Sequence, residues 1–317
     1  MARVEIEGLR SLILQRLEPM FPDDHAERIA DVVLFGEMAG RRSHGIIRLF
    51  PGSYGVMDEG VEPRPEVEKL GRSSARVQGS QGMLLASIAT DLVEELAVES
   101  GFAVVTTRGS RSTSGSLTYF VEKLTDAGLV ASVSAGTPNF VGLPGGSGRI
   151  LGTNPLAFGI PTNQRPFILD MATSAISGGD VLTAAASGSK LPRGVAVSTA
   201  GDATVDPDDV LAGGAVLPFG GHKGLGLSLM VEILNKALTG ATGDPGDWGH
   251  LFVAFSMSLL GDEGDIRRRA QAEIDRLEAG GARIPGHRSL AIRDEALTLG
   301  WVEVDDDAYE RLLAAVG

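Results

Sequence analysis

A glycine-rich loop that leads directly into an apolar segment is the feature that most constrains how this chain can fold. Glycines at positions 220, 221, 224 and 226 surround His222 and Lys223, and the apolar stretch continues to Gly240. Glycine accepts positive φ and lets the backbone approach a ligand, and a helix that begins there directs its free N–H groups into the loop. The apolar spacing predicts a helix whose buried face carries Leu227, Met230, Val231, Leu234 and Leu238.

This segment favours a loop that holds an anion or a dinucleotide against the start of a helix. It is not a triphosphate-binding loop, because that motif needs Gly-Lys-Ser/Thr, and here the lysine precedes Gly224 with no hydroxyl in the required place. A buried helix with a flexible entry turn is the plainer interpretation, and the segment alone leaves both open.

Composition narrows the class of protein. The chain has 317 residues with 43% hydrophobic and 22% charged residues, which is typical of a soluble globular protein of one large or two smaller domains. A net charge of -13 argues against a nucleic-acid partner. The absence of cysteine excludes disulfides and a thiol nucleophile, and no apolar run reaches the length of a membrane span. A cytoplasmic protein without a membrane partner is the expectation.

Helical and strand patterns alternate in the middle of the chain, which indicates an α/β or α+β fold. Helices are expected at 5–18, 23–40, 83–99 and 117–125, and strands at 75–78, 103–107, 129–135, 156–160 and 167–169. Residues 61–70 are rich in Pro and Glu and read as a connector, and the small residues 172–186 read as a helix. Helices at 265–279 and 306–316 and a strand at 250–255 complete the pattern.

Several standard catalytic signatures are missing. The chain has no Gly-x-Gly-x-x-Gly, no Gly-x-Ser-x-Gly and no His-Glu-x-x-His, and its five histidines are too dispersed to predict a metal site. His44 is the best general acid because histidine titrates near neutral pH, and Arg48 suits a substrate carboxylate. His44 as a helix cap, Lys223 as a surface residue and Asp170 as a helix cap remain the structural alternatives.

Six stretches in order, spread over nearly the whole chain, resemble one family: the malate/L-lactate dehydrogenases that lack a standard Rossmann fold. Their relatives include ureidoglycolate dehydrogenase, diketogulonate reductase and the piperideine/pyrroline-2-carboxylate (ketimine) reductases. The first stretch is Ser43-His44-Gly45 with Arg48-Leu49, similar to the family's Ser-His-Gly-x-x-Arg-Leu. The others are Leu151–Pro161, Leu169–Ser174, Thr204–Pro207, Leu217–Gly240 and Ile284–Gly286.

The resemblance implies an α/β (α+β) fold in which helical N- and C-terminal parts pack with a mixed, largely antiparallel, cofactor-binding sheet domain. The corresponding parts of this chain are 1–72 with the Ser-His-Gly motif, 73–215 with the sheet, and 216–317 with the glycine loop. Family members are typically dimers with active sites near the subunit contact, which implies a homodimer.

The resemblance also implies roles for individual residues, with NAD or NADP as the cofactor and no metal. His44 corresponds to the proton donor, and Ser43, Arg48 and Thr113 fall in the substrate site. The cofactor contacts carried over are Asp170, Met171, Ala172, Thr173, Ser174, His222, Lys223, Pro285, Gly286 and His287. The cofactor supplies the redox chemistry, so the protein needs only to position the substrate and provide a proton.

One departure from the family pattern shapes the functional hypothesis. Aligned on Tyr119-Phe120, the second family histidine, a proton acceptor in some members, is Thr113 here. Threonine cannot act as a base at neutral pH, whereas reduction needs only His44. We therefore expect a divergent reductase of a small 2-oxo acid or cyclic imino acid that belongs to a specialised biosynthetic pathway. A malate/lactate-type dehydrogenase, a non-catalytic cofactor-binding protein, and a lyase or isomerase on the same fold are the alternatives.

Overall fold

The computed structural model describes residues 1–50, 55–56, 64–143, 145–146, 148–243 and 247–317. The chain forms two compact units, and each is built from separate stretches of sequence. Unit 1 comprises Met1–Val133, Ala157–Asp170 and Phe252–Gly317, and unit 2 comprises Ser134–Leu156 and Met171–Leu251.

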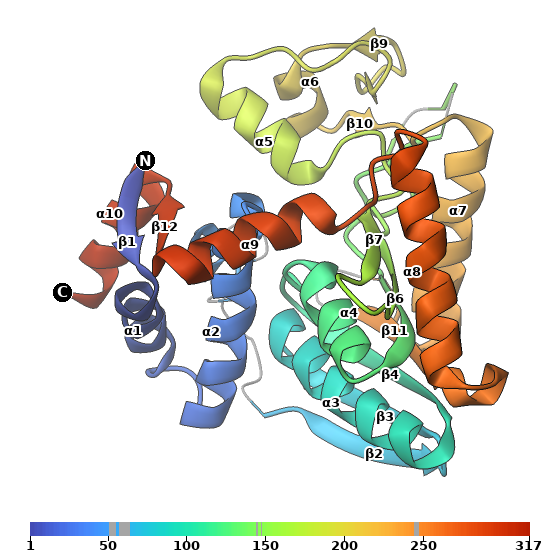
Figure 1. Cartoon of the computed structure of the whole chain (residues 1–317). Helices are drawn as coiled ribbons and strands as arrows, with labels where there is room; N and C mark the ends of the chain where they lie inside the picture. Colours follow the sequence, from blue (N-terminus) through green and yellow to red (C-terminus); the bar gives the residue numbers. More distant parts are fainter. Residues whose placement is uncertain (51–54, 57–63, 144, 147, 244–246) are drawn as a thin grey trace. The chain divides into compact units, whose positions relative to one another are not determined.

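A seven-stranded sheet is the centre of unit 1, with strand order β2-β3-β4-β11-β5-β6-β7 (Figure 1). It is mixed, since β2 pairs antiparallel with β3 while β3 and β4 run parallel. The long helix α3 covers β3 and β4, and the left-handed Gly101 ends this helix before β4 begins. The strands are β2 (Glu66–Gly71), β3 (Ser74–Ser80), β4 (Phe102–Ser110), β5 (Leu129–Ala135), β6 (Leu156–Ile160), β7 (Phe167–Met171) and β11 (Trp248–Ser256).

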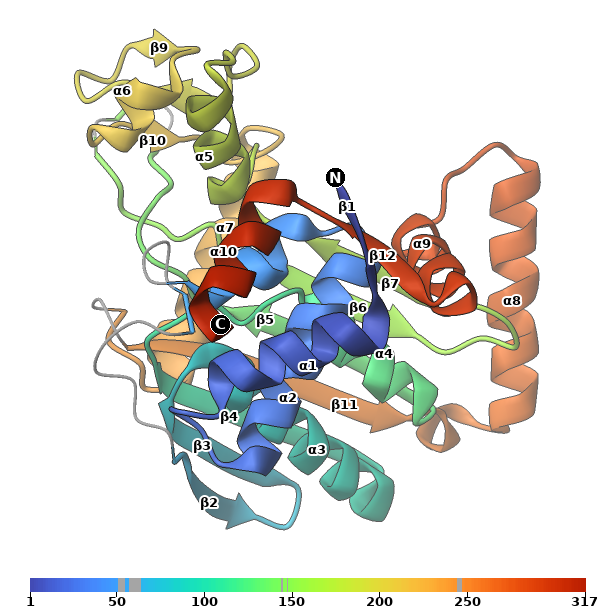
Figure 2. The ribbon, with the colours of Figure 1, turned by 90° about the vertical axis from the view of Figure 1, so that its left-hand side faces the viewer.

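Helices from both ends of the chain pack together in unit 1. Strand β1 pairs antiparallel with β12, and α1 packs against α2 and α10 (Figure 2). The apolar face of α1 is fully buried, as its periodicity requires. These elements are β1 (Ala2–Glu5), α1 (Ile6–Leu17), α2 (Asp23–Met38), η1 (Arg42–His44), η2 (Ile46–Leu49), α3 (Gly82–Ser100), α4 (Leu117–Asp126), η4 (Met257–Leu260), α8 (Glu263–Ala279), α9 (His287–Leu299), β12 (Trp301–Val304) and α10 (Asp306–Val316).

Unit 2 has its own hydrophobic core, built around Val141, Leu151, Val181 and Val216. A three-stranded sheet of order β10-β8-β9 lies beside α5 and α6. The elements are α5 (Gly178–Ser187), β8 (Ala196–Val197), β9 (Ala203–Thr204), α6 (Pro207–Leu211), β10 (Ala215–Val216), α7 (His222–Ile233) and η3, a π-helical turn (Leu234–Leu238).

The predicted fold class is confirmed: a mixed, largely antiparallel sheet carries the helical N- and C-terminal parts, and the fold is not a standard Rossmann fold. The helices and strands expected from periodicity form close to their predicted bounds. The three segments predicted from the order of the motifs are contiguous, whereas both compact units are discontinuous in sequence.

Three local predictions are wrong. Residues 66–71 form the edge strand β2 instead of a connector, and 61–63 lie outside the described residues. Residues 172–177 are not helical, because Ser174 pairs with Pro218 and the capping Ser177 starts α5 only at Gly178.

The third wrong prediction concerns which face of α7 and η3 is buried. Their buried face carries Gly224, Ser228, Val231 and Asn235, while Met230, Ile233 and Leu238 are 40–62% exposed. Small residues on the buried face let α7 approach its neighbours closely, so the larger apolar side chains are left facing outward.

Candidate active site

The Ser43-His44 turn is a compact structure built at the end of α2. Ser43 and His44 lie in η1, and Arg48 lies in η2 directly after Gly45. Ser43 Oγ is 3.0 Å from His44 Nδ1, and Arg48 Nε donates to the Ser43 carbonyl over 2.6 Å. The turn therefore holds an imidazole, a hydroxyl and a guanidinium close together.

The side chain of Arg48 is half-buried, and its guanidinium stays charged. Desolvation lowers the pKa of its guanidinium, but arginine starts so high that the group keeps its charge at neutral pH. A charged, half-buried guanidinium is a favourable partner for a carboxylate, because the attraction is stronger away from bulk water.

The Ser43-His44 turn and the loop that ends at Gly115 both pack closely against α2. A Cβ atom at Gly36 would lie 2.6 Å from the His44 carbonyl, and one at Gly115 would lie 2.5 Å from Val32 Cγ1. The loop before Gly115 carries Thr113, whose Oγ1 accepts a hydrogen bond from the Gly115 amide over 3.1 Å. Thr113 thus uses its hydroxyl to stabilise its own loop.

Asp170 is surrounded by donors. Its Oδ2 accepts from the Thr118 amide at 3.0 Å, from Thr118 Oγ1 at 2.7 Å and from Ser116 Oγ at 3.2 Å, and it forms an ion pair with Arg41 at 3.4 Å. Its carboxylate therefore caps the start of α4, and it connects that helix to the residue just before η1. Asp170 does not cap the helix that follows it in sequence, since Ser177 is the N-cap of α5, and the cofactor role predicted for Asp170 stays a prediction.

Pro285 and Gly286 lie against Ile168 of β7, which is two residues before Asp170 in the sequence. The Ile168 amide donates to the Pro285 carbonyl at 3.4 Å, and Gly286 has φ +85°. A Cβ at position 286 would lie 2.7 Å from the Ile168 carbonyl, so only glycine fits here without a shift of the backbone.

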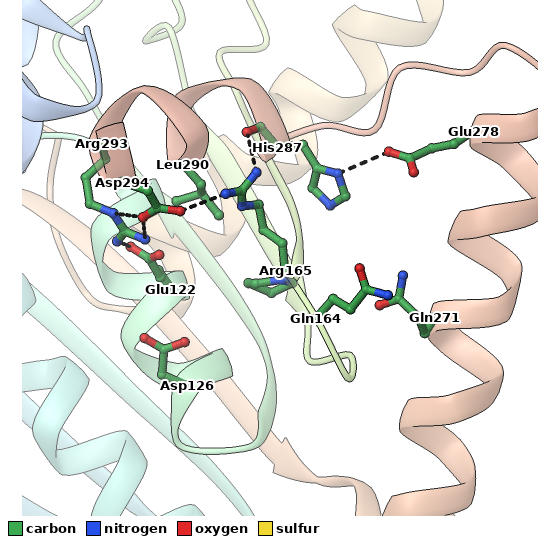
Figure 3. A pocket seen from close by; sticks show the side chains of 11 residues that line it. Glu122, Asp126, Gln164, Arg165, Gln271, Glu278, His287, Leu290, Arg293 and Asp294 are labelled. Atoms are coloured by element: carbon green, nitrogen blue, oxygen red, sulfur yellow. Dashed lines mark hydrogen bonds and ion pairs between the residues drawn. The ribbon is translucent and has the colours of Figure 1, made fainter. Parts of the chain in front are cut away.

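His287 points away from this contact into a polar cavity of about 580 Å³ (Figure 3). Its Nδ1 lies 3.2 Å from Glu278 of α8. Arg165 pairs with Asp294 at 2.7 Å, and Arg293 pairs with Glu122 at 2.6 Å. Burial raises the pKa of Glu122 even though Arg293 opposes that shift. The guanidinium groups of this cavity are already paired, so it offers no ready site for cofactor phosphates.

The predicted cofactor residues of unit 2 form one continuous backbone arrangement. Thr173 donates through its amide and its hydroxyl to the Thr153 carbonyl, at 2.9 and 3.1 Å. Ser174 pairs with Pro218, and the Phe219 amide donates to the Thr173 carbonyl at 3.1 Å. Thr173 and Ser174, which directly follow Met171 and Ala172, therefore lie between the Gly-Thr-Asn-Pro segment and the glycine loop.

The glycine loop leaves its backbone accessible. Gly220 and Gly221 have φ +56° and +63°, and a Cβ atom on either would meet nothing within 4 Å. His222 and Lys223 follow at the exposed N-terminus of α7. An exposed glycine loop, a helix N-terminus and a lysine are the elements that an anion site requires, and the cofactor contacts predicted here stay a prediction.

Sequence reasoning missed Glu37 and Arg41. Glu37 is only 3% exposed and accepts a hydrogen bond from the Ile46 amide over 2.8 Å. A signal was present, because Glu37 continues the buried stripe of Ala26, Ala30 and Val33 on α2. A carboxylate on an apolar helix face is unusual enough to mark a special position.

Comparison with known proteins now identifies the relationship. The family model for malate/L-lactate dehydrogenase matches residues 4–313. The chain belongs to this family. As a member it is an oxidoreductase.

Relatives differ in their named substrates. The Δ1-pyrroline-2-carboxylate/Δ1-piperideine-2-carboxylate reductase of Pseudomonas putida is 34% identical over 88% of this chain and 86% of its own length. The L-sulfolactate dehydrogenase of Methanothermobacter thermautotrophicus is 33% identical over 92% of this chain and 89% of its own length. The crystal structure of Δ1-piperideine-2-carboxylate reductase from Pseudomonas syringae covers 99% of this chain and all of its own, with 31% identity and a TM-score of 0.87.

Proposed function

We propose that this protein reduces a small 2-oxo acid or cyclic imino acid with NADH or NADPH, and that His44 donates the proton. The observation that carries the proposal is the Ser43–Arg48 turn, in which a proton donor and a carboxylate partner lie in one short, well-packed segment. The named substrates of the relatives share a carboxylate beside the carbon that changes oxidation state.

The reduction would divide between cofactor and protein. The bound nicotinamide supplies hydride to the carbonyl or imine carbon. Arg48 orients the substrate by binding its carboxylate, and His44 transfers a proton to the oxygen or nitrogen as negative charge develops there. Ser43, hydrogen-bonded to His44 Nδ1, favours presentation of the other ring nitrogen, Nε2, to the substrate.

The glycine loop supports dinucleotide binding. The open backbone of Gly220 and Gly221 fits the close approach of a phosphate, and Lys223 adds positive charge at the start of α7. We propose His222, Lys223 and the segment Asp170–Ser174 as cofactor contacts, with Pro285, Gly286 and His287 as secondary candidates. The choice between NAD and NADP is part of the test.

Thr113 favours reduction over alcohol oxidation. Its hydroxyl already accepts the Gly115 amide and has no basic character, so the second proton-accepting group of some family members is missing from this loop. We therefore propose that a malate- or lactate-type oxidation is the weaker activity.

Single-turnover and steady-state assays test the proposal directly. The purified protein is incubated with NADH or NADPH and with pyruvate, oxaloacetate or Δ1-piperideine-2-carboxylate, and nicotinamide absorbance is followed. Turnover is expected with at least one pair, and His44→Asn should lower kcat at least about 100-fold while cofactor affinity, measured by fluorescence titration, stays within threefold.

The alternatives give different results. Cofactor binding without turnover by the wild-type protein would support a non-catalytic cofactor-binding protein. Product formation without a change in nicotinamide absorbance would support a lyase or isomerase. Absence of both binding and turnover would refute the oxidoreductase proposal.

We also propose a homodimer and a cytoplasmic location. The exposed apolar face of α7 and η3, formed by Leu227, Leu229, Met230, Ile233 and Leu238, supports an interface with a second copy. In the described part of the chain, no helix is long and apolar enough to cross a membrane.

A further inference from the structure

The buried carboxyl group of Glu37 lies directly beneath the turn that carries His44. Glu37 is the penultimate residue of α2, and its Oε1 accepts a hydrogen bond from the Ile46 amide over 2.8 Å. Ile46 is the first residue of η2, so this bond connects the end of one helix to the start of the segment that holds Arg48. Among the described residues, the buried Oε2 of Glu37 has no hydrogen-bond partner.

The packing around this carboxyl group leaves little freedom. A Cβ atom at Gly45 would collide with Glu37 Oε1 and with the carbon of that carboxyl group, while a Cβ atom at Gly36 would lie 2.6 Å from the His44 carbonyl oxygen. Glycine at both positions therefore brings α2 into direct contact with the backbone of residues 44 and 45. Because the packing is this close, a change in the position or charge of the Glu37 carboxyl group should shift the backbone of the turn.

We infer that Glu37 is a positioning residue for His44: its carboxyl group fixes the Ser43–Arg48 turn, and its protonation state adjusts how the imidazole and the guanidinium are presented to the substrate. The inference rests on the proposed function of His44 and goes beyond it, since nothing in the reduction itself calls for an acid at position 37.

The surroundings of Glu37 place its titration in the working range of an enzyme. Burial raises the pKa of Glu37 to about 7, opposed by the Ile46 amide and by Arg42 of η1 and assisted by Asp305 before α10. Of the other charged groups nearby, Glu303 of β12 lies 3.9 Å from Arg42, and Arg48 of η2 donates to Ser43. Near neutral pH the group therefore exchanges between a carboxylate, which strengthens the bond to Ile46, and an acid, which weakens it.

Two substitutions separate the effect of the hydrogen bond to the Ile46 amide from the effect of ionisation of the Glu37 carboxyl group. Glu37→Gln keeps an oxygen for the Ile46 amide but cannot ionise, so kcat should stay within about threefold while the inflection near pH 7 disappears from its pH profile. Glu37→Leu removes the acceptor, and kcat should fall at least about tenfold with cofactor affinity unchanged, because misplaced groups slow the reaction more than they weaken binding.

The matched control is Glu122→Gln, which removes another buried carboxyl group of unit 1. It should lower thermal stability and leave the pH profile of kcat as in the wild type. An unchanged profile in Glu37→Gln together with wild-type kcat in Glu37→Leu would overturn the inference. Equal loss of kcat in Glu37→Leu and Glu122→Leu would reduce the effect to stability and overturn it as well.

A readout that needs no turnover separates this inference from the proposed function. The chain has five histidines, so the imidazole signals of His44 can be assigned in an NMR spectrum by comparison with His44→Asn. In the wild type these signals should respond to the Glu37 titration, and Glu37→Gln should remove that response. Hydrogen exchange of the Ile46 amide should accelerate at least about tenfold in Glu37→Leu. If these changes occur in a protein without reductase activity, only the proposed function fails.

Discussion

Two histidines, His44 and His250, carry the same imidazole in very different surroundings. His44 is half-buried beside a hydroxyl in a turn, whereas His250 is 1% exposed in β11, and burial lowers the pKa of His250 to about 4. A buried imidazole is kept neutral because the charged form loses its hydration. His250 is therefore a neutral part of the core, whereas His44 keeps part of its side chain accessible.

The buried imidazole predicts a dependence of stability on pH. Because the pKa of His250 is depressed on folding, its contribution is complete above about pH 6.5 and is lost as the pH falls toward 4, where the unfolded chain takes up the proton first. The free energy of unfolding should fall by about 3 kcal/mol from this group over that window. Urea denaturation between pH 4 and 7 measures it.

His250→Asn should be less stable at pH 7 but should lose less on acidification than the wild type. His222→Gln, which removes an exposed imidazole, is the control and should follow the wild-type curve. Parallel curves for His250→Asn and the wild type would contradict the assignment.

Arg48 carries a second prediction at this scale. A planar guanidinium binds a carboxylate through two hydrogen bonds, which the ammonium of lysine cannot reproduce. Arg48→Lys should raise KM for the acid substrate about tenfold or more with a smaller effect on kcat, measured by steady-state kinetics. An Arg48→Lys enzyme with wild-type KM would assign the carboxylate contact to another residue.

The residues of the candidate site could be predicted from the sequence only where they lie close together in the sequence. Ser43, His44 and Arg48 are adjacent in sequence, and the structure brings them together. Glu37 and Arg41 act through contacts with segments that the sequence separates from them, up to the ion pair between Arg41 and Asp170. Periodicity marks Glu37 as a buried position, but it does not show which segment a side chain contacts, because that depends on tertiary packing.

Elements followed from periodicity, and the contacts between them did not. The helices α2, α3 and α4 form near their expected bounds because their apolar stripes and their ends are local properties of the sequence. The buried face of α7 was predicted incorrectly, because helical spacing also fits a stripe that faces outward. Strand β2 was missed because all its residues are exposed. A strand without a buried face does not need the regular alternation of apolar and polar side chains from which strands are predicted.

The junction of β7 and α9 predicts unequal effects of two similar substitutions. Gly286 and Gly281 both have a left-handed φ, +85° and +86°, but only a Cβ at 286 would press on the Ile168 carbonyl. Gly281→Ala should cost roughly 1 kcal/mol from backbone strain alone. Gly286→Ala should cost about 2–4 kcal/mol, because β7 or α9 must shift as well. Urea denaturation of the two variants measures the difference.

Equal losses of stability in the two alanine variants would show that β7 and α9 can shift apart without a cost in free energy. If Gly286 also contacts the cofactor, Gly286→Ala should weaken cofactor binding while Gly281→Ala should not. A fluorescence titration separates this effect from the loss of stability.

At the scale of the whole molecule, the order of motifs identified the family, whereas the division into compact units depends on tertiary contacts. Strands β5, β6, β7 and β11 each include residues from both compact units, so the chain passes from one unit to the other four times. A sequence read from end to end divides into contiguous parts, and such a division cannot contain a unit assembled from three separate stretches. The family match does not depend on this division, because it runs along the sequence from residue 4 to residue 313.

The outward face of α7 and η3 carries the last prediction, which concerns assembly. Ile233 and Leu238 are 60% and 62% exposed, and burying each against a second copy would contribute about 1–2 kcal/mol. If this face forms the dimer contact, Ile233→Lys with Leu238→Lys should convert a dimer to a monomer in light scattering at micromolar concentration, since two charges would have to be buried. Val98→Lys with Leu260→Lys is the matched control, because these residues of unit 1 are 66% and 68% exposed, and that variant should stay dimeric. A dimer that survives the first pair and dissociates with the second would move the interface to unit 1.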